Sequence, residues 1–251
     1  MAVDLKRPLL SIVLGCLVWS TGTVAQTAAP PLLPQLTSYA LFGQVSWMLT
    51  VDSRHTPLLA ATAGADLLTE QLGRQDAADD AAARGAVRSR LGAIRALYGA
   101  LDRLTSDQAS LSPASSGFLP AIVGQRGTET CVVLSTFMST KVYNTIQLTA
   151  RARASTVFHD NAMPILRAMG RADGVEGVTC IGVSISYGSK NFLDRSVMAT
   201  KGETLVVLAP LAVARQFAGG DLTEDDLLAK ADVYLADRDA TDLTKVKLAL
   251  P

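Results

Sequence analysis

Two short apolar runs decide the fold of this 251-residue chain: TCVVLSTFM at residues 130–138 and TCIGVSISY at residues 179–187. Both are rich in β-branched residues, and the second alternates large apolar with small residues, which is typical of β-strands. An offset of 49 residues superposes the two runs and suggests a duplicated strand–strand–helix (ββα) unit, although the identities are few enough to arise by chance. If the duplication is real, we expect the two strands side by side in one sheet.

The cysteines support the same pairing. Cys131 and Cys180 occupy equivalent positions in the two runs, and they are the only cysteines beyond residue 25. Two such thiols in an oxidising compartment usually pair. The sequence therefore predicts a Cys131–Cys180 disulfide, with two separate buried thiols as the alternative.

The first 25 residues have the features of a secretory signal peptide. Lys6 and Arg7 precede a short apolar segment, and small residues at Thr23 and Ala25 predict cleavage after Ala25. We expect a periplasmic or secreted protein that has no transmembrane segment after cleavage. The alternatives are a retained anchor, for which the apolar run is too short, and lipid attachment at Cys16.

The remaining chain is predicted to be an α+β protein. Residues 26–36 are rich in proline and form an expected flexible leader, whereas residues 37–106 carry apolar residues at helical spacing and predict an N-terminal helical hairpin or bundle unit. Residues 107–128 are rich in Ser, Pro and Gly and are interpreted as a linker, or as a loop that crosses one compact fold. Residues 129–251 are expected to form a mainly antiparallel sheet with packed helices.

A polar strand face is the candidate binding site. Residues 142–152 alternate polar and apolar side chains, which predicts a half-exposed strand antiparallel to residues 131–138, followed by a helix at 155–169 and a last strand at 246–250. The polar side of the alternation comprises Tyr143, Thr145, Gln147, Thr149, Arg151 and Arg153. Such a face suits a glycan, a peptide strand or an anionic lipid headgroup, and the alternative is an ordinary solvent-facing side of a sheet.

Composition and motifs exclude several classes of function. The 23 basic and 23 acidic residues leave no basic excess, which argues against a nucleic-acid-binding protein. The hydrophobic fraction of 49% argues against disorder. The sequence contains no Gly-x-Ser-x-Gly, phosphate-loop or His-Glu-x-x-His motif, and its two histidines show no ligand spacing. We expect no metal and no cofactor.

Catalytic candidates are few. His159 and Asp160 form the single pair that suggests acid–base chemistry, and Ser184 or Ser186 would have to supply a nucleophile. Our leading hypothesis is an exported non-catalytic binding or assembly protein of the bacterial cell envelope, whose partner is an envelope protein or a glycan or peptide ligand. The alternatives are an exported hydrolase that uses His159 with a strand serine, and an envelope sensor built on the predicted disulfide.

Overall fold

The computed structural model describes most of the second half of the chain and parts of the first. The described residues are 29–50, 81–101, 104, 111–113, 121–196 and 200–250, with the backbone alone at 42–50, 111–113, 136 and 140. The predicted signal peptide at residues 1–25, including Cys16, lies outside the described residues.

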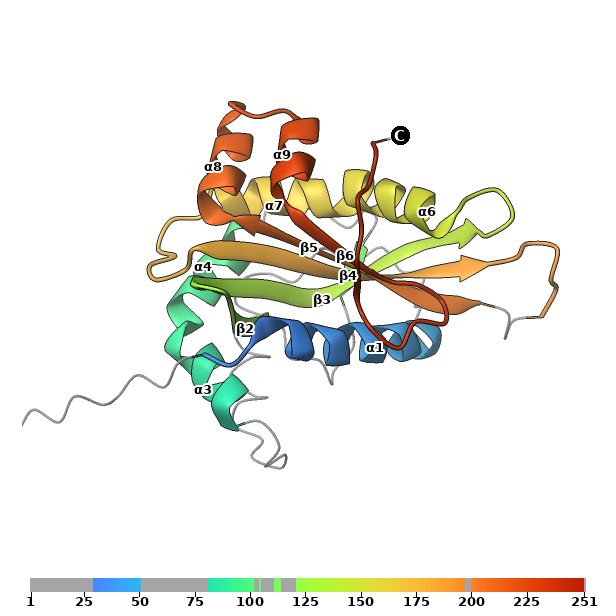
Figure 1. Cartoon of the computed structure of the whole chain (residues 1–251), viewed down its shortest axis with the longest axis horizontal. Coiled ribbons are helices and arrows are strands. Elements are labelled where there is room, and N and C mark those ends of the chain that lie inside the picture. The colour runs from blue at the N-terminus through green and yellow to red at the C-terminus, as the bar shows by residue number, and fades with distance from the viewer. Residues whose placement is uncertain are drawn as a thin grey trace, which may run out of the picture.

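The described strands form one seven-stranded mixed sheet with helices on both faces (Figure 1). The strands are β1 (Leu111–Pro113), β2 (Ala121–Arg126), β3 (Glu129–Asn144), β4 (Cys180–Lys190), β5 (Lys201–Pro210), β6 (Asp232–Ala236) and β7 (Thr244–Lys245). The helices are α1 (Leu32–Thr50), α3 (Ala81–Ser89), α4 (Leu91–Ala100), α6 (Ala150–Val157), α7 (Met163–Gly170), α8 (Leu211–Gly219) and α9 (Glu224–Lys230), with a π-helical segment η2 (Phe158–Ala162) between α6 and α7. The predicted α+β class is confirmed.

The central pair of the sheet is parallel and the other pairs are antiparallel. The strand order is β1-β3-β4-β5-β6-β7, and β2 also pairs with β3 on the β1 side. Strands β3 and β4 run parallel with Cys131 opposite Cys180. The two apolar runs therefore lie side by side, as predicted, in a sheet that is mainly antiparallel.

A disulfide joins the two central strands. Cys131 and Cys180 are bonded, and their Cα atoms lie 4.3 Å apart. Both cysteines are fully buried in a cluster that includes Leu32 and Leu36 of α1. The predicted disulfide is confirmed, and such bonds are typical of proteins that mature in oxidising compartments.

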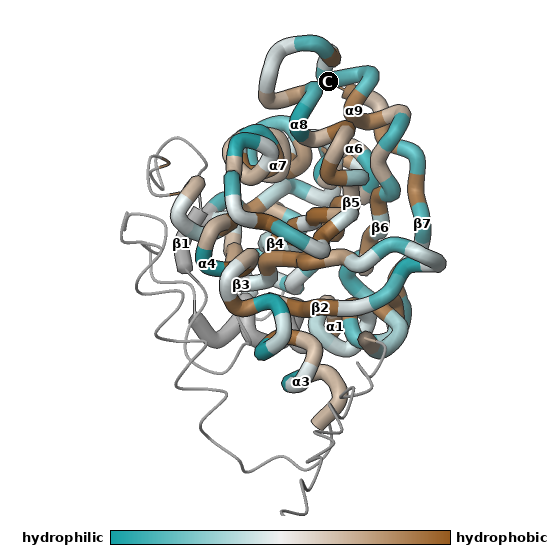
Figure 2. The backbone as a smooth tube through the Cα atoms, turned by 90° about the vertical axis from the view of Figure 1, so that its left-hand side faces the viewer, coloured by the Kyte–Doolittle hydropathy of each residue, from teal (hydrophilic) through white to brown (hydrophobic). Residues whose placement is uncertain are grey.

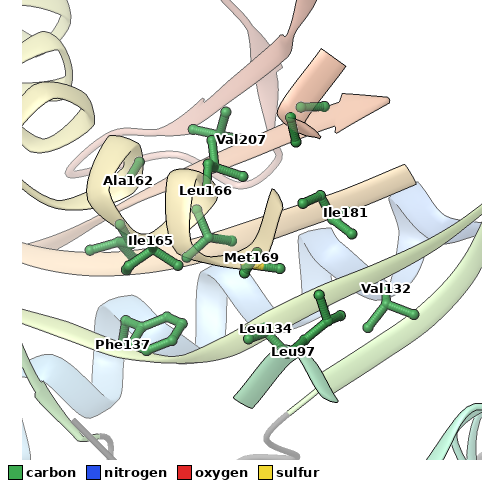
Figure 3. Packing of buried hydrophobic residues seen from close by; sticks show 14 of the residues in the cluster. Leu97, Val132, Leu134, Phe137, Ala162, Ile165, Leu166, Met169, Ile181 and Val207 are labelled. Atoms are coloured by element: carbon green, nitrogen blue, oxygen red, sulfur yellow. The ribbon is translucent and has the colours of Figure 1, made fainter. Parts of the chain in front are cut away.

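The opposite face of the sheet carries the larger core. Helix α7 packs on it through Ile165, Leu166 and Met169, which lie close to apolar side chains of β3 and β4 (Figure 3). In Figure 2 the hydrophobic strands lie between an upper layer formed by α6 to α9 and a lower layer that contains α1. Because both faces of the sheet are covered, its inner strands β4 and β5 are buried on both sides.

The helix predicted at residues 155–169 is longer than expected. It starts at Ala150, where the Thr149 hydroxyl oxygen accepts a hydrogen bond from the Ala152 amide at 3.2 Å, and it continues through η2 to Gly170. Pro164 lies in the first turn of α7, directly after the π-helical segment. A proline cannot donate the backbone hydrogen bond of a helix interior, so a local change of helical pitch is expected beside it.

The predicted strand at residues 142–152 is wrong. Strand β3 continues from residue 129 to Asn144 with two register shifts, and α6 follows after a short turn. The Thr149 cap and the alanine-rich turn after it favour a helix over the alternating pattern. The ββα duplication is wrong for the same reason, because its first copy contains one strand where two were expected.

Regular elements also lie within the segments expected to form a leader and a linker. Helix α1 already begins at Leu32, within the expected leader, and packs against β2, β4 and β5, whereas α4 contacts α7. Strands β1 and β2 lie within the expected linker. Apolar residues of these segments are thus part of the same core as the sheet. The strand predicted at 246–250 is wrong too, since β7 ends at Lys245.

The disulfide generates a first prediction. Replacing both cysteines with alanine (Cys131→Ala with Cys180→Ala) should lower the free energy of unfolding by about 2–4 kcal/mol, because the unfolded chain is released from a cross-link. Urea denaturation followed by circular dichroism measures the change. Equal midpoints for the double variant and the wild-type protein would contradict the cross-link.

Candidate binding surface

The histidine proposed for catalysis lies at the surface, away from the candidate serines. His159 is on η2 with its side chain 45% exposed, and its Nδ1 atom lies 3.5 Å from Oε2 of Glu224. Ser186 faces the opposite side of the sheet, where its hydroxyl lies 3.1 Å from that of Thr204, next to α1. Ser184 lies two residues before Ser186 on β4, so its side chain points to the same face of the sheet. The structure does not bring the histidine and the serines together.

Asp160 is engaged elsewhere. Its Oδ2 atom lies 2.7 Å from the Lys141 ammonium group, so the carboxylate joins the start of the π-helical segment to the end of β3. This contact is an ion pair at the rim of the sheet. Asp160 is therefore not the carboxylate that would support His159 in a catalytic triad.

The residues of the predicted polar strand face are divided among a strand, a turn and a helix. Tyr143 is buried at the end of β3, Thr145 and Gln147 lie on the turn, and Thr149 caps α6. The first turn of the helix carries the two arginines, of which Arg151 is exposed and Arg153 is buried. These six side chains therefore form no continuous face, although they cluster at one end of the molecule.

A buried ion pair organises that end. Nε and Nη2 of Arg153 lie 3.0 and 2.5 Å from the two carboxylate oxygens of Glu203 on β5, and the two side chains are 5% and 0% exposed. Nη1 of the same guanidinium donates a 2.6 Å hydrogen bond to the Leu148 carbonyl. Bidentate pairing is the geometry in which an arginine and a carboxylate attract most strongly. The pair thus links the turn before α6 to the sheet.

Two tyrosines lie beside this pair. The rings of Tyr143 and Tyr187 meet edge to face with centroids 5.6 Å apart. Burial, reinforced by the negative charge of Asp160, raises the pKa of Tyr143 to about 12. Burial and the charge of Glu203 also raise the pKa of Tyr187 well above its ordinary value. Both phenols therefore stay neutral at physiological pH.

Exposed hydrophobic side chains gather at the same end of the molecule. Val142, Ile146, Phe192 and Leu193 are 37%, 55%, 56% and 82% exposed, and the described residues contain only one other exposed large hydrophobic side chain, Leu33 of α1. We call these four residues the apolar tip. Contiguous exposed apolar side chains in a folded protein usually mark a binding surface.

The apolar tip is formed by two loops that the parallel strands bring together. Strands β3 and β4 end at the same level, with Asn144 opposite Lys190, and the Thr145 amide donates a 3.0 Å hydrogen bond to the Lys190 carbonyl. Figure 1 shows the loop from β3 to α6 and the loop from β4 to β5 at one end of the sheet. The two loops therefore present their side chains together.

Each loop begins with an asparagine that fixes the apolar residue after it. The Asn144 side-chain oxygen accepts a hydrogen bond from the Ile146 amide at 3.1 Å. The Asn191 oxygen accepts one from the Leu193 amide at 2.9 Å. Such turns reverse the chain locally. Both apolar side chains are exposed on these turns.

Basic side chains lie near the apolar tip. Lys141 and Lys201 pair with Asp160 and Asp239, yet their side chains are 46% and 44% exposed. Lys190 and Arg195 have no ion-pair partner within the part of the chain that the structure describes. The tip is therefore an apolar centre with a basic margin.

A hollow in the surface lies beside Arg151. It has a volume of about 410 Å³ and is lined by α6 and by the segment 235–246, which contributes Asp237, Asp239 and Asp242. The last of these carboxylates accepts hydrogen bonds from the Thr37 hydroxyl and the Leu243 amide. Within the described ranges, no cluster of His, Cys, Asp or Glu side chains has the arrangement of a metal site.

A signal for the apolar tip is present in the sequence. Phe192 and Leu193 lie in the connection between β4 and β5, where two large apolar residues could have been recognised as exposed. Ile146 carries no such signal, because it falls within the alternating pattern at residues 142–152. Glu203 carries no such signal, because a lone acidic residue before an apolar run usually marks the exposed end of a strand.

Comparison with known proteins assigns no relative to the chain. No family model, no curated protein and no solved structure matches it. Within the described residues, no helix is both long enough and apolar enough to cross a bilayer. The function is therefore inferred from the geometry of the chain itself.

The buried ion pair generates a second prediction. Arg153→Met should lower the free energy of unfolding by about 3–5 kcal/mol, because it leaves the Glu203 carboxylate buried without its partner. Arg151→Met, two residues away on the exposed side of the same helix, is the matched control and should change it by less than about 0.5 kcal/mol. Urea denaturation measures both. A similar small change in the two variants would contradict the structural role of the pair.

The tyrosines generate a third prediction, on pH. The pKa of an unfolded tyrosine is about 10, whereas burial raises that of Tyr143 to about 12. The folded state thus favours the neutral phenol, and this stabilisation is complete below the unfolded pKa and is lost as the pH rises toward the folded one. The free energy of unfolding should fall above about pH 10, and less steeply in the Tyr143→Phe variant. An identical pH dependence in the wild-type protein and the Tyr143→Phe variant would contradict a raised pKa for Tyr143.

Proposed function

We propose that the chain is an exported, non-catalytic binding or assembly protein of the bacterial cell envelope that contacts its partner through the apolar tip. The observation that carries the proposal is the exposure of Phe192 and Leu193 at the end of a rigid sheet. Leaving large apolar side chains in water is unfavourable, so their concentration at one place favours a contact function.

Export is supported by two independent features. The first 25 residues have the pattern of a signal peptide, and the Cys131–Cys180 disulfide is typical of an oxidising compartment. A periplasmic or secreted location is consistent with both. The proposal does not depend on which of these two locations the protein occupies.

The geometry gives less support to the alternatives. A hydrolase would need His159 within hydrogen-bond reach of a nucleophile, yet Ser186 lies on the other face of the sheet. A redox sensor would need an accessible disulfide, yet Cys131 and Cys180 are fully buried. Binding through the apolar tip requires no such rearrangement.

In-cell photo-crosslinking tests the proposal. A photo-reactive amino acid in place of Phe192 should give a covalent adduct with an envelope component. The same group in place of Leu33, an exposed apolar residue on α1, is the matched control and should give none. Adducts of equal yield at both positions, or at neither, would contradict a binding role for the apolar tip.

A further inference from the structure

We infer that the apolar tip binds the surface of an anionic lipid bilayer, with Ile146, Phe192 and Leu193 inserted at the level of the headgroups. The inference rests on the proposed binding role of the tip. It names the chemical class of the partner, which that proposal leaves open.

The arrangement of apolar residues suits insertion into a lipid surface. The three side chains lie on two adjacent loops at one end of the sheet, and each loop is turned back by its own asparagine. Because these side chains are exposed on loops, they can enter a fluid interface without a complementary cavity in the partner. Aromatic and leucine side chains beside cations are the usual composition of surfaces that lie in the headgroup region.

Charge complementarity selects anionic lipids. Lys190 and Arg195 flank Phe192 and Leu193 in the chain and have no ion-pair partner among the described residues. Asp194, which accepts a hydrogen bond from the Ser196 amide at 2.9 Å, lies between them and keeps its negative charge, so residues 190–195 carry a net charge of +1. An apolar centre with basic neighbours is attracted to negatively charged headgroups within a Debye length of the surface.

Charge argues against a second copy of the chain as the partner, because that copy would bring its own Lys190 and Arg195 close to those of the first. A lipid surface requires no minimum shape complementarity and supplies the opposite charge.

Vesicle sedimentation tests the inference. The mature protein is purified after export from the cells that produce it. It is mixed with vesicles of phosphatidylglycerol and, in a separate sample, with vesicles of phosphatidylcholine. We expect the protein to sediment with the anionic vesicles and to bind the neutral ones on the order of tenfold more weakly. Binding to the anionic vesicles should also weaken as the salt concentration rises.

Three variants assign the binding to the tip. The Phe192→Ser with Leu193→Ser variant and the Lys190→Gln with Arg195→Gln variant should each lose most of the binding to phosphatidylglycerol, whereas Leu33→Ser should bind like the wild-type protein. Circular dichroism confirms that each variant is folded. Undiminished sedimentation of either double variant would overturn the inference.

The two proposals fail in distinguishable ways. If the protein does not sediment with anionic vesicles but still gives a crosslink from position 192 in cells, the bilayer is the wrong partner and the binding role of the tip stands. If neither vesicle binding nor the crosslink is found, both proposals are wrong. A crosslink to a protein in place of lipid would contradict the inference directly.

Discussion

The parallel pairing of β3 with β4 is the constraint on which the rest of the structure depends. A parallel pair cannot be closed by a tight turn, so the chain must cross over one face of the sheet, and α6, η2 and α7 make that crossing. The opposite face is then left for α1, which covers the Cys131–Cys180 disulfide. The same pairing ends both strands at one level, where their following loops meet.

The end of the sheet that carries the apolar tip is held by charged and polar groups. Burial of Arg153 and Glu203 removes two charges from water, a cost that is offset only when the geometry of the pair is good and its remaining donors are used. The hydrogen bond from Arg153 to the Leu148 carbonyl uses one of them and fixes the turn beside Ile146. The apolar tip is therefore a loop surface on a rigid support, the arrangement on which binding residues are most often found.

Much of the second half of the fold was predictable from the sequence, because it depends on local patterns. The alternation from 179 to 187 identified β4, and the equivalent positions of Cys131 and Cys180 identified its neighbour. The error at residues 142–152 arose because an alternating pattern also fits the end of a strand followed by a turn. Only the Thr149 cap marks the change to a helix. The start of α1 within the expected leader could not be predicted, because the burial of Leu32 depends on contacts with distant strands.

The candidate site was less predictable than the fold. The six polar residues were expected to share one strand face, and that grouping depended on a strand that is not there. The apolar tip depends on the relation of two loops separated by about 45 residues of chain, a relation that only the strand register establishes.

A scalar coupling measured by nuclear magnetic resonance across the Thr145 N–H to Lys190 carbonyl hydrogen bond tests that register most directly. The structure predicts that the coupling is present and that the Thr145 amide exchanges slowly with solvent. Rapid exchange of this amide with no coupling would contradict the juxtaposition of the two loops.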